Sequence, residues 1–101
     1  MTDQDQGESV ATQQAVIKNR AGIHCRPTAV IVKEARTFED EITVQLGEQT
    51  GDAKSAIELL SMGLEEGATV EIHTAGPTAS ASIARMVELF ETEFDFPPRD
   101  E

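Results

Sequence analysis

The chain has 101 residues, of which 39% are hydrophobic, so it is long enough for one domain with a single core and too short for two. It carries 19 acidic and 8 basic residues, and its formal net charge of -11 repels nucleic-acid backbones and anionic membrane surfaces. Four Phe and no Trp or Tyr leave little material for stacking bases. We therefore expect an aliphatic core and neither nucleic acid nor membrane as a partner.

The single cysteine and the two ends of the chain limit the cellular setting. Cys25 has no second cysteine with which to form an intramolecular disulfide or a paired-cysteine metal site. The first nine residues lack the basic and apolar regions of a secretion signal, and no later run reaches membrane-spanning length. The sequence predicts a cytoplasmic protein with a flexible acidic leader over residues 1–10, a domain over 11–94 and a flexible tail over 95–101.

The first third of the domain predicts a strand followed by a helix. Alternating positions over residues 13–18 favour a strand, and Ala21 and Gly22 mark a turn. The helix predicted over residues 26–38 has Pro27 in its first turn. Its apolar positions recur at helical spacing: Val30, Ile31, Ala35 and Phe38.

The middle of the chain predicts a hairpin and a short helix. Residues 41–46 alternate apolar and polar side chains, as a strand with one buried face does. A returning strand of low apolar content is predicted over residues 49–52. Ser55 and Glu58 have the spacing of a capping box, in which each side chain bonds a backbone N–H at the start of a helix, here running to Met62.

The last third predicts one more strand and one more helix. Residues 69–74 alternate, with Val70 and Ile72 on the inner face, and Thr78 can cap the helix that follows. That helix has apolar residues at i, i+3, i+4 and i+7: Ile83, Met86, Val87 and Phe90. The element order predicts an α+β fold of the open-faced sandwich type, with three helices on one face of a four-stranded, largely antiparallel sheet.

The most informative stretch is AGIHCRPTA, residues 21–29. His24 lies at or next to the N-cap of the predicted helix, so unpaired backbone N–H groups and the positive end of the helix dipole point at its ring. These groups and the guanidinium of Arg26 disfavour the imidazolium form, which leaves a ring nitrogen free to attack phosphorus. The same groups stabilise a phosphorylated ring, whose oxygens suit bidentate binding by Arg. The alternative is that His24 is an ordinary cap or turn residue.

Residues 22–27, Gly-Ile-His-Cys-Arg-Pro, resemble the phosphorylation motif Gly-Leu-His-x-Arg-Pro of the HPr family. Members of this family are phosphocarriers of the bacterial phosphoenolpyruvate-dependent sugar phosphotransferase system. The resemblance runs from about residue 13 to residue 94. It includes further short matches in family order, at residues 32–35, 41–44, 53–55, 62–64 and 66–67.

The resemblance implies a relay in which phosphoenolpyruvate phosphorylates enzyme I, enzyme I phosphorylates the carrier, and the carrier phosphorylates a IIA component. By this resemblance His24 accepts and donates the phosphoryl group through Nδ1, and Arg26 steadies it. A protein of this kind is a component of a phosphotransferase system rather than a stand-alone enzyme. We expect a monomer without a metal or organic cofactor.

The resemblance also implies a docking face and a regulatory site. The face that meets enzyme I and IIA proteins maps to residues of the first two helices: Cys25, Ala29, Ala56, Ile57, Leu60 and Ser61. Some of these apolar side chains should be exposed in the free protein. Ser55 corresponds to the serine that HPr kinase phosphorylates in many bacteria, and its alternative role is that of a helix cap.

Three departures from the family pattern concern the partners. Glu58 stands where many members carry a basic or small residue, and the whole chain is unusually acidic. Encounter with an acidic enzyme I should therefore be slow, unless the partner of this chain is less acidic. Ala21 replaces a polar residue that is common just before the Gly-x-His motif.

Other interpretations remain open at this point. A thiol enzyme built on Cys25 and His24 is disfavoured because adjacent residues at a helix start diverge. His73 faces outward from the last strand without an obvious second ligand, and we assign it no function. The second class of function is a regulatory binding module switched by phosphorylation at His24 or Ser55. Within the carrier class, the sequence does not separate sugar uptake from a nitrogen-related or regulatory relay.

Overall fold

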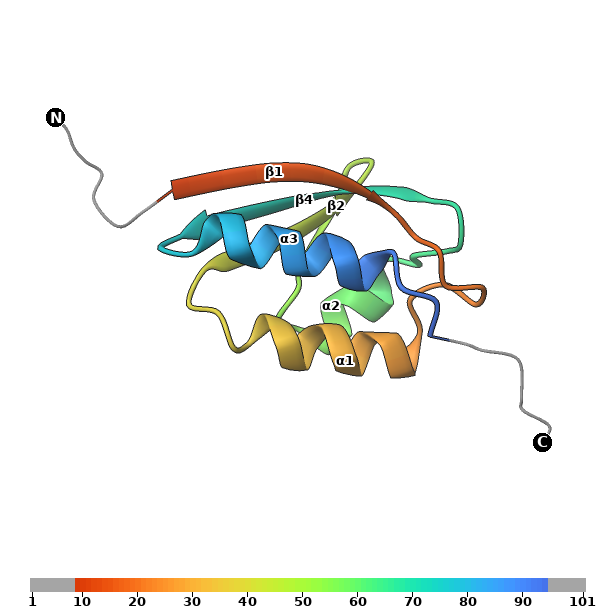
Figure 1. Ribbon diagram of the computed structural model, residues 1–101. Coiled ribbons are helices and arrows are strands. Elements are labelled where there is room, and N and C mark those ends of the chain that lie inside the picture. Colours follow the sequence, from red (N-terminus) through yellow and green to blue (C-terminus); the bar gives the residue numbers. More distant parts are fainter. Residues whose placement is uncertain (1–8, 95–101) are drawn as a thin grey trace, which may run out of the picture.

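The computed structural model describes residues 9–94, which form a four-stranded sheet with three helices on one face (Figure 1). All strand pairs are antiparallel, and the strand order is β1-β4-β2-β3. The predicted open-faced α+β fold is confirmed. The elements in chain order are β1 (Ser9–Val16), α1 (Cys25–Ala35), β2 (Glu41–Leu46), β3 (Gln49–Asp52), α2 (Ala56–Ser61), β4 (Thr69–Gly76) and α3 (Ala79–Phe90).

The core lies between the sheet and the helices. Alternate residues of β4 point inward and are buried: Val70, Ile72 and Thr74. They pack with aliphatic side chains from the other elements, as the composition predicts. Among residues 9–94, Phe90 is the one aromatic side chain of the buried core. No helix within this part of the chain is both long and apolar enough to cross a membrane.

Several element boundaries differ from the prediction by one or two residues, and two differ by more. β1 begins at Ser9 rather than at residue 13, because it pairs with β4 along its whole length, from Ser9 opposite Gly76 to Val16 opposite Thr69. Ser9 and Val10, assigned to the leader, therefore belong to the sheet. The rest of the predicted leader and the whole predicted tail lie outside the described residues.

The first helix also ends earlier than predicted. It stops at Ala35 rather than at Phe38. The carbonyl of Glu34 accepts hydrogen bonds from both the N–H and the hydroxyl of Thr37, at 3.0 and 2.7 Å, which closes the last turn. Side-chain bonding of this kind competes with helix continuation.

The helix caps are partly those predicted. Ser55 is the N-cap of α2 and accepts a hydrogen bond from the N–H of Glu58 at 3.3 Å. The reciprocal half of the capping box is wrong, because Glu58 accepts its bond from the N–H of Asp52 at 2.7 Å. Thr78 is the N-cap of α3, but its side chain does not cap the helix and donates instead to Asp40 at 2.7 Å.

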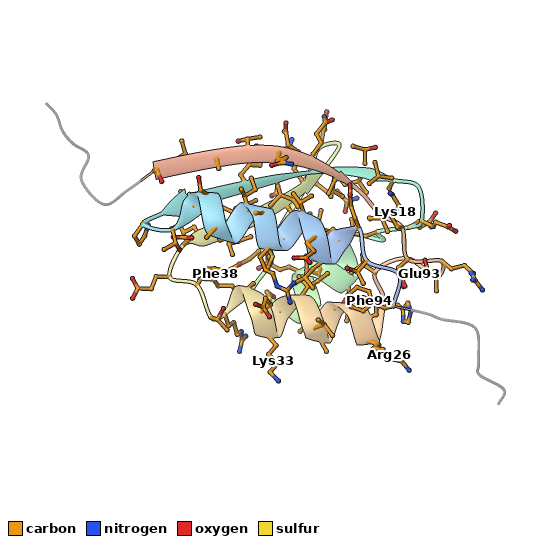
Figure 2. The ribbon with its side chains drawn as sticks, viewed as in Figure 1. Lys18, Arg26, Lys33, Phe38, Glu93 and Phe94 are labelled. Atoms are coloured by element: carbon orange, nitrogen blue, oxygen red, sulfur yellow. The ribbon has the colours of Figure 1, made fainter. Side chains whose placement is uncertain are left out.

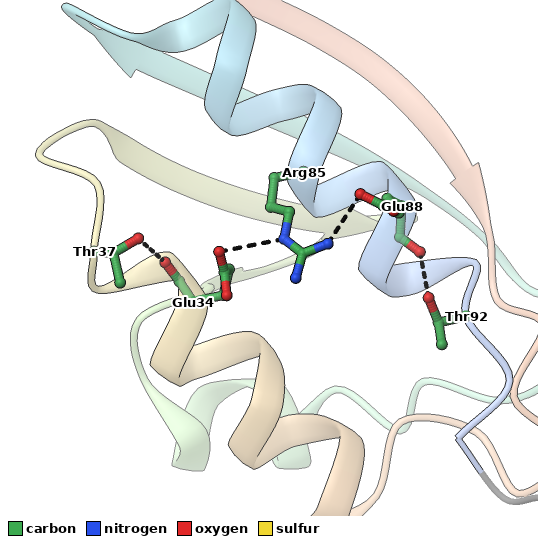
Figure 3. Close-up of polar contacts among 5 residues, drawn as sticks. All are labelled: Glu34, Thr37, Arg85, Glu88 and Thr92. Carbon is green, nitrogen blue, oxygen red and sulfur yellow. Dashed lines mark hydrogen bonds and ion pairs between the residues drawn. The ribbon is translucent and has the colours of Figure 1, made fainter.

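The helices α1 and α3 are joined by one cation between two carboxylates (Figure 3). Arg85 of α3 contacts Glu34 of α1 at 3.2 Å and Glu88 of its own helix at 2.9 Å. These hydrogen bonds raise the pKa of Arg85 above its ordinary value. The ion pair between Arg85 and Glu34 links the two long helices, which lie side by side over the sheet.

Candidate functional site

His24 is the N-cap residue of α1, as the sequence predicts. Its backbone is extended (φ −104°, ψ −154°), and its side chain is half-buried and makes no capping bond to the helix. The carbonyl of His24 accepts the first helical bond, from the N–H of Thr28 at 2.9 Å. The first turn contains no acidic side chain, so the positive end of the helix is not neutralised from within it. This end of α1 therefore suits an anion bound next to the His24 ring.

A tight turn leads into His24. The carbonyl of Asn19 accepts a bond from the N–H of Gly22 at 2.8 Å, which confirms the turn expected at Gly22. Gly22 has a φ of 77°, and a Cβ there would lie 2.4 Å from the carbonyl oxygen of Leu64, so only glycine fits. The next N–H, that of Ile23, donates to the same Leu64 oxygen at 2.8 Å. The backbone before His24 is thus held against the turn that follows α2.

The charged residue nearest to His24 in the motif is Arg26, in the first turn of α1. Arg26 is exposed, and its side chain projects into solvent, as does that of Lys33 further along the helix (Figure 2). Cys25 is also exposed. Within residues 9–94 no group of three His, Cys, Asp or Glu side chains is placed to hold a metal ion. The chemistry available here is that of an imidazole beside a helix N-terminus and an exposed guanidinium.

The residues predicted for the docking face come from α1 and α2, which pack against each other and run antiparallel. Arg36 at the end of α1 donates to the carbonyl of Lys54 just before α2, at 3.1 Å. At the opposite end, the loop before α1 meets Leu64, which follows α2. The end of α2 therefore lies near the start of α1 (Figure 1).

The predicted exposure of this face is confirmed. Ile57 is 77% exposed and Leu60 is 44% exposed, although both are large apolar side chains. The smaller members of the predicted face are exposed as well: Cys25, Ala29, Ala56 and Ser61. Exposed apolar side chains on neighbouring helices are typical of a protein-binding surface.

Ser55 lies at the far end of this helix pair from His24. It begins α2, next to the end of α1, whereas His24 begins α1. The eleven residues of α1 span about 16 Å at 1.5 Å per residue. A phosphate on Ser55 would therefore not touch the His24 ring.

Three polar residues have surroundings that the sequence analysis did not predict. Asn19 is fully buried and forms hydrogen bonds to the backbone of Gly22 and of Phe94. The spacing Asn-x-x-Gly, typical of a type I turn, could have marked it. Thr28 is 1% exposed, and its hydroxyl has no hydrogen-bond partner in the described part of the chain. His73 faces outward as expected, but it contacts Thr12 at 3.1 Å and Gln45 at 3.2 Å.

Comparisons with known proteins agree with the motif and with the fold. Residues 11–92 match the family model described as "PTS HPr component phosphorylation site". The phosphocarrier protein HPr of Vibrio cholerae is 37% identical over 79 residues, which cover 78% of this chain and 93% of that protein.

Solved structures of HPr proteins have the same fold. An HPr from Thermoanaerobacter tengcongensis superposes with a TM-score of 0.76 at 30% identity, over 79% of this chain and 90% of that one. HPr from Bacillus anthracis gives a TM-score of 0.77 at 23% identity, over 80% of this chain and 96% of that one. A structure described as an HPr dimer, also from T. tengcongensis, gives 0.62 at 33% identity, over 72% and 84%. With the motif, the fold and these relatives in agreement, the chain belongs to the HPr family.

Proposed function

We propose that this chain is a phosphocarrier that accepts a phosphoryl group from phosphorylated enzyme I on His24 and passes it to a IIA component of a sugar phosphotransferase system. The observation that carries the proposal is the place of His24, at the N-terminus of α1 on a backbone held by Gly22 and Leu64. The match of residues 11–92 to the HPr family model supports it.

The reaction transfers a phosphoryl group from the donor protein to a ring nitrogen of His24, and then from His24 to the acceptor protein. A ring nitrogen of His24, Nδ1 by the family resemblance, forms a bond to phosphorus while the bond from phosphorus to the donor breaks. The helix N-terminus stabilises the negative charge on the phosphoryl oxygens, and Arg26 is close enough in sequence to fold over them. The acceptor then attacks the same phosphorus, and the His24 ring leaves. Positioning and charge stabilisation are the protein's main contributions.

The docking face supports an exchange of partners. Ile57 and Leu60 offer exposed apolar surface beside the site, and enzyme I and IIA proteins would use it in turn. A carrier of this kind works as a monomer in the cytoplasm, because one face must be free for successive partners. Sedimentation of the purified protein tests the monomer.

Regulation at Ser55 is a separate part of the proposal. The Ser55 hydroxyl already accepts the N–H of Glu58 as a helix cap, which accounts for a serine here without a kinase. A phosphate about 16 Å from His24 would act beyond the Debye length of roughly 8 Å at physiological salt. Phosphorylation by an HPr kinase would therefore change docking near Ile57 rather than the reactivity of the His24 ring.

The direct test is phosphate transfer from phosphoenolpyruvate through purified enzyme I to the wild-type protein and to His24→Ala. We expect the wild type alone to gain one acid-labile phosphoryl group by intact mass and to lose it when a IIA protein is added. Ser55→Ala is the matched control and should be phosphorylated like the wild type. No transfer from several enzyme I proteins would reject the carrier and favour the regulatory binding module.

A further inference from the structure

The backbone that precedes His24 is held by a buried carboxamide. Asn19 is fully buried, and its Nδ2 donates to the carbonyl of Gly22 at 2.7 Å. Its Oδ1 accepts the N–H of Phe94 at 2.5 Å, from a residue 75 positions further along the chain. One side chain thus joins the turn before His24 to the segment that follows α3.

Neighbouring contacts extend this junction. The carboxylate of Glu91 accepts the N–H of Val16 at 2.9 Å, and that of Glu93 accepts the N–H of Arg20 at 3.3 Å. Phe94 is half-buried and packs against the core between the end of α3 and the start of α1 (Figure 2). The segment 91–94 therefore runs along the whole approach to the site.

The hydrogen bond from Asn19 to Gly22 fixes the orientation of the peptide between Gly22 and Ile23, and the next peptide leads to His24. The carbonyl of Gly22 belongs to the peptide whose N–H, on Ile23, points at Leu64. Asn19 holds this peptide from the carbonyl side and Leu64 holds it from the N–H side. A rotation of the peptide would turn the N-cap residue away from the end of α1. Small displacements of a reacting group are costly, about a hundredfold in rate for 1 Å.

The role requires a carboxamide. The side chain must donate one hydrogen bond and accept another in a site without solvent, and a buried polar group is retained only when it is satisfied. A carboxylate lacks the donor, and an aliphatic side chain lacks both groups.

We propose that Asn19 is a positioning residue for His24, which fixes the imidazole at the N-terminus of α1 by holding the carbonyl of Gly22. The inference rests on the proposed phosphocarrier function only for its kinetic consequence. The geometric consequence can be measured without any partner.

The test uses the full chain and compares Asn19→Ala with Thr74→Val. Thr74 is a matched control because it is 2% exposed and donates one buried hydrogen bond, to the carbonyl of Ala79 at 3.0 Å. That bond lies at the start of α3, at the opposite end of the molecule from the start of α1 (Figure 1). Thermal unfolding of both variants checks that each of them is folded. If Asn19→Ala does not fold, Asn19→Asp replaces it, because a carboxylate can still accept the N–H of Phe94 but cannot donate to the carbonyl of Gly22.

Two readouts separate positioning from mere stability. In ¹H–¹⁵N spectra, the His24 ring signals should move in Asn19→Ala and stay in place in Thr74→Val, while the His73 ring signals serve as an internal reference in Asn19→Ala. In phosphoryl transfer, kcat of Asn19→Ala should fall about 10- to 100-fold with little change in KM. His24 signals and kcat that match those of Thr74→Val would overturn the inference. A wild type that accepts no phosphoryl group would reject the carrier function, and the ring signals would still decide the role of Asn19.

Discussion

Thr28 carries a buried hydroxyl without a hydrogen-bond partner among the described residues, one turn into α1 from His24. A buried, unsatisfied polar group costs about 1–3 kcal/mol, and valine has nearly the same shape. We predict that Thr28→Val raises the free energy of unfolding by about 1 kcal/mol, measured by urea denaturation.

The matched control is Thr74→Val, in which the same substitution removes a hydroxyl that does donate a bond, to Ala79. This variant should lose about 1 kcal/mol, because the carbonyl of Ala79 is left without that donor. Equal effects of the two substitutions would show that the Thr28 hydroxyl is satisfied.

The site could be predicted from the sequence only where its residues lie close together in the chain. His24, Gly22 and Arg26 are close together in the chain, and their relation to a helix start follows from local rules of turns and caps. The role of Asn19 depends on Phe94, 75 residues away, and the fit at Gly22 depends on the carbonyl of Leu64. Contacts between distant segments require the fold, so they were absent from the sequence analysis.

The start of α3 is held by a residue from another part of the chain, Asp40, which bonds the N-cap residue Thr78. Asp40, just before β2, is fully buried and accepts bonds from the N–H and the hydroxyl of Thr78, at 2.9 and 2.7 Å. Burial raises the pKa of Asp40, but hydrogen bonds from Ser82 and Thr78 and the charge of Lys54 outweigh it. The net pKa lies below the ordinary value of 3.8.

A lowered pKa in the folded state fixes the sign of the pH dependence. The carboxylate of Asp40 contributes stability above the unfolded pKa of 3.8, and this contribution is lost as the pH falls through the lower folded pKa. We predict that Asp40→Asn lowers the free energy of unfolding at pH 7 by about 2 kcal/mol, since hydrogen bonds to a charged group are worth roughly 1.5–3 kcal/mol. Its stability should also fall less than that of the wild type below about pH 4.

Urea denaturation between pH 2 and pH 7 measures both effects. Asp52→Asn is the control, because it removes an exposed carboxylate that accepts one backbone bond, from Lys54 at 2.9 Å. Its effect should be much smaller. A wild type and an Asp40→Asn variant that lose stability in parallel in acid would contradict the proposed cap.

At the scale of elements, the sequence was most informative where one local pattern decides the structure. Residues 41–46 and 49–52 form strands with the predicted bounds, because alternation marks the first strand and Gly47 marks the turn between the two. The start of β1 was missed because pairing with β4, rather than its own polar sequence, makes Ser9 to Thr12 a strand. Thr78 is the N-cap residue of α3 as predicted, but its side chain bonds Asp40, which comes from another part of the chain, instead of the helix.

The charge of the whole molecule bears on the encounter with partners. The net charge is -11, and Glu58 is exposed on α2 beside the predicted docking residues Ile57 and Leu60. Like charges on two proteins slow their association, and salt screens the effect. With an acidic enzyme I, Glu58→Lys should raise kcat/KM for phosphorylation roughly two- to fivefold at low ionic strength.

The control for this prediction is Glu41→Lys, which makes the same change of charge at an exposed residue of β2. Ile42 next to it points into the core, so Glu41 belongs to the face of the sheet away from the helices. Glu41→Lys should have a smaller effect, and 0.5 M salt should remove the gain of Glu58→Lys. Equal gains would indicate that only the net charge matters and not the docking face.

The central claim is that His24 carries the phosphoryl group, and the described residues offer one rival imidazole, His73, on the opposite face of the sheet. The most direct test is a ¹H–¹⁵N spectrum of both rings before and after phosphorylation by enzyme I and phosphoenolpyruvate. We predict a large shift of one ring nitrogen of His24, unchanged His73 signals, and return of the original spectrum when a IIA protein is added. A phosphoryl group on His73, or on a residue other than a histidine, would contradict the account.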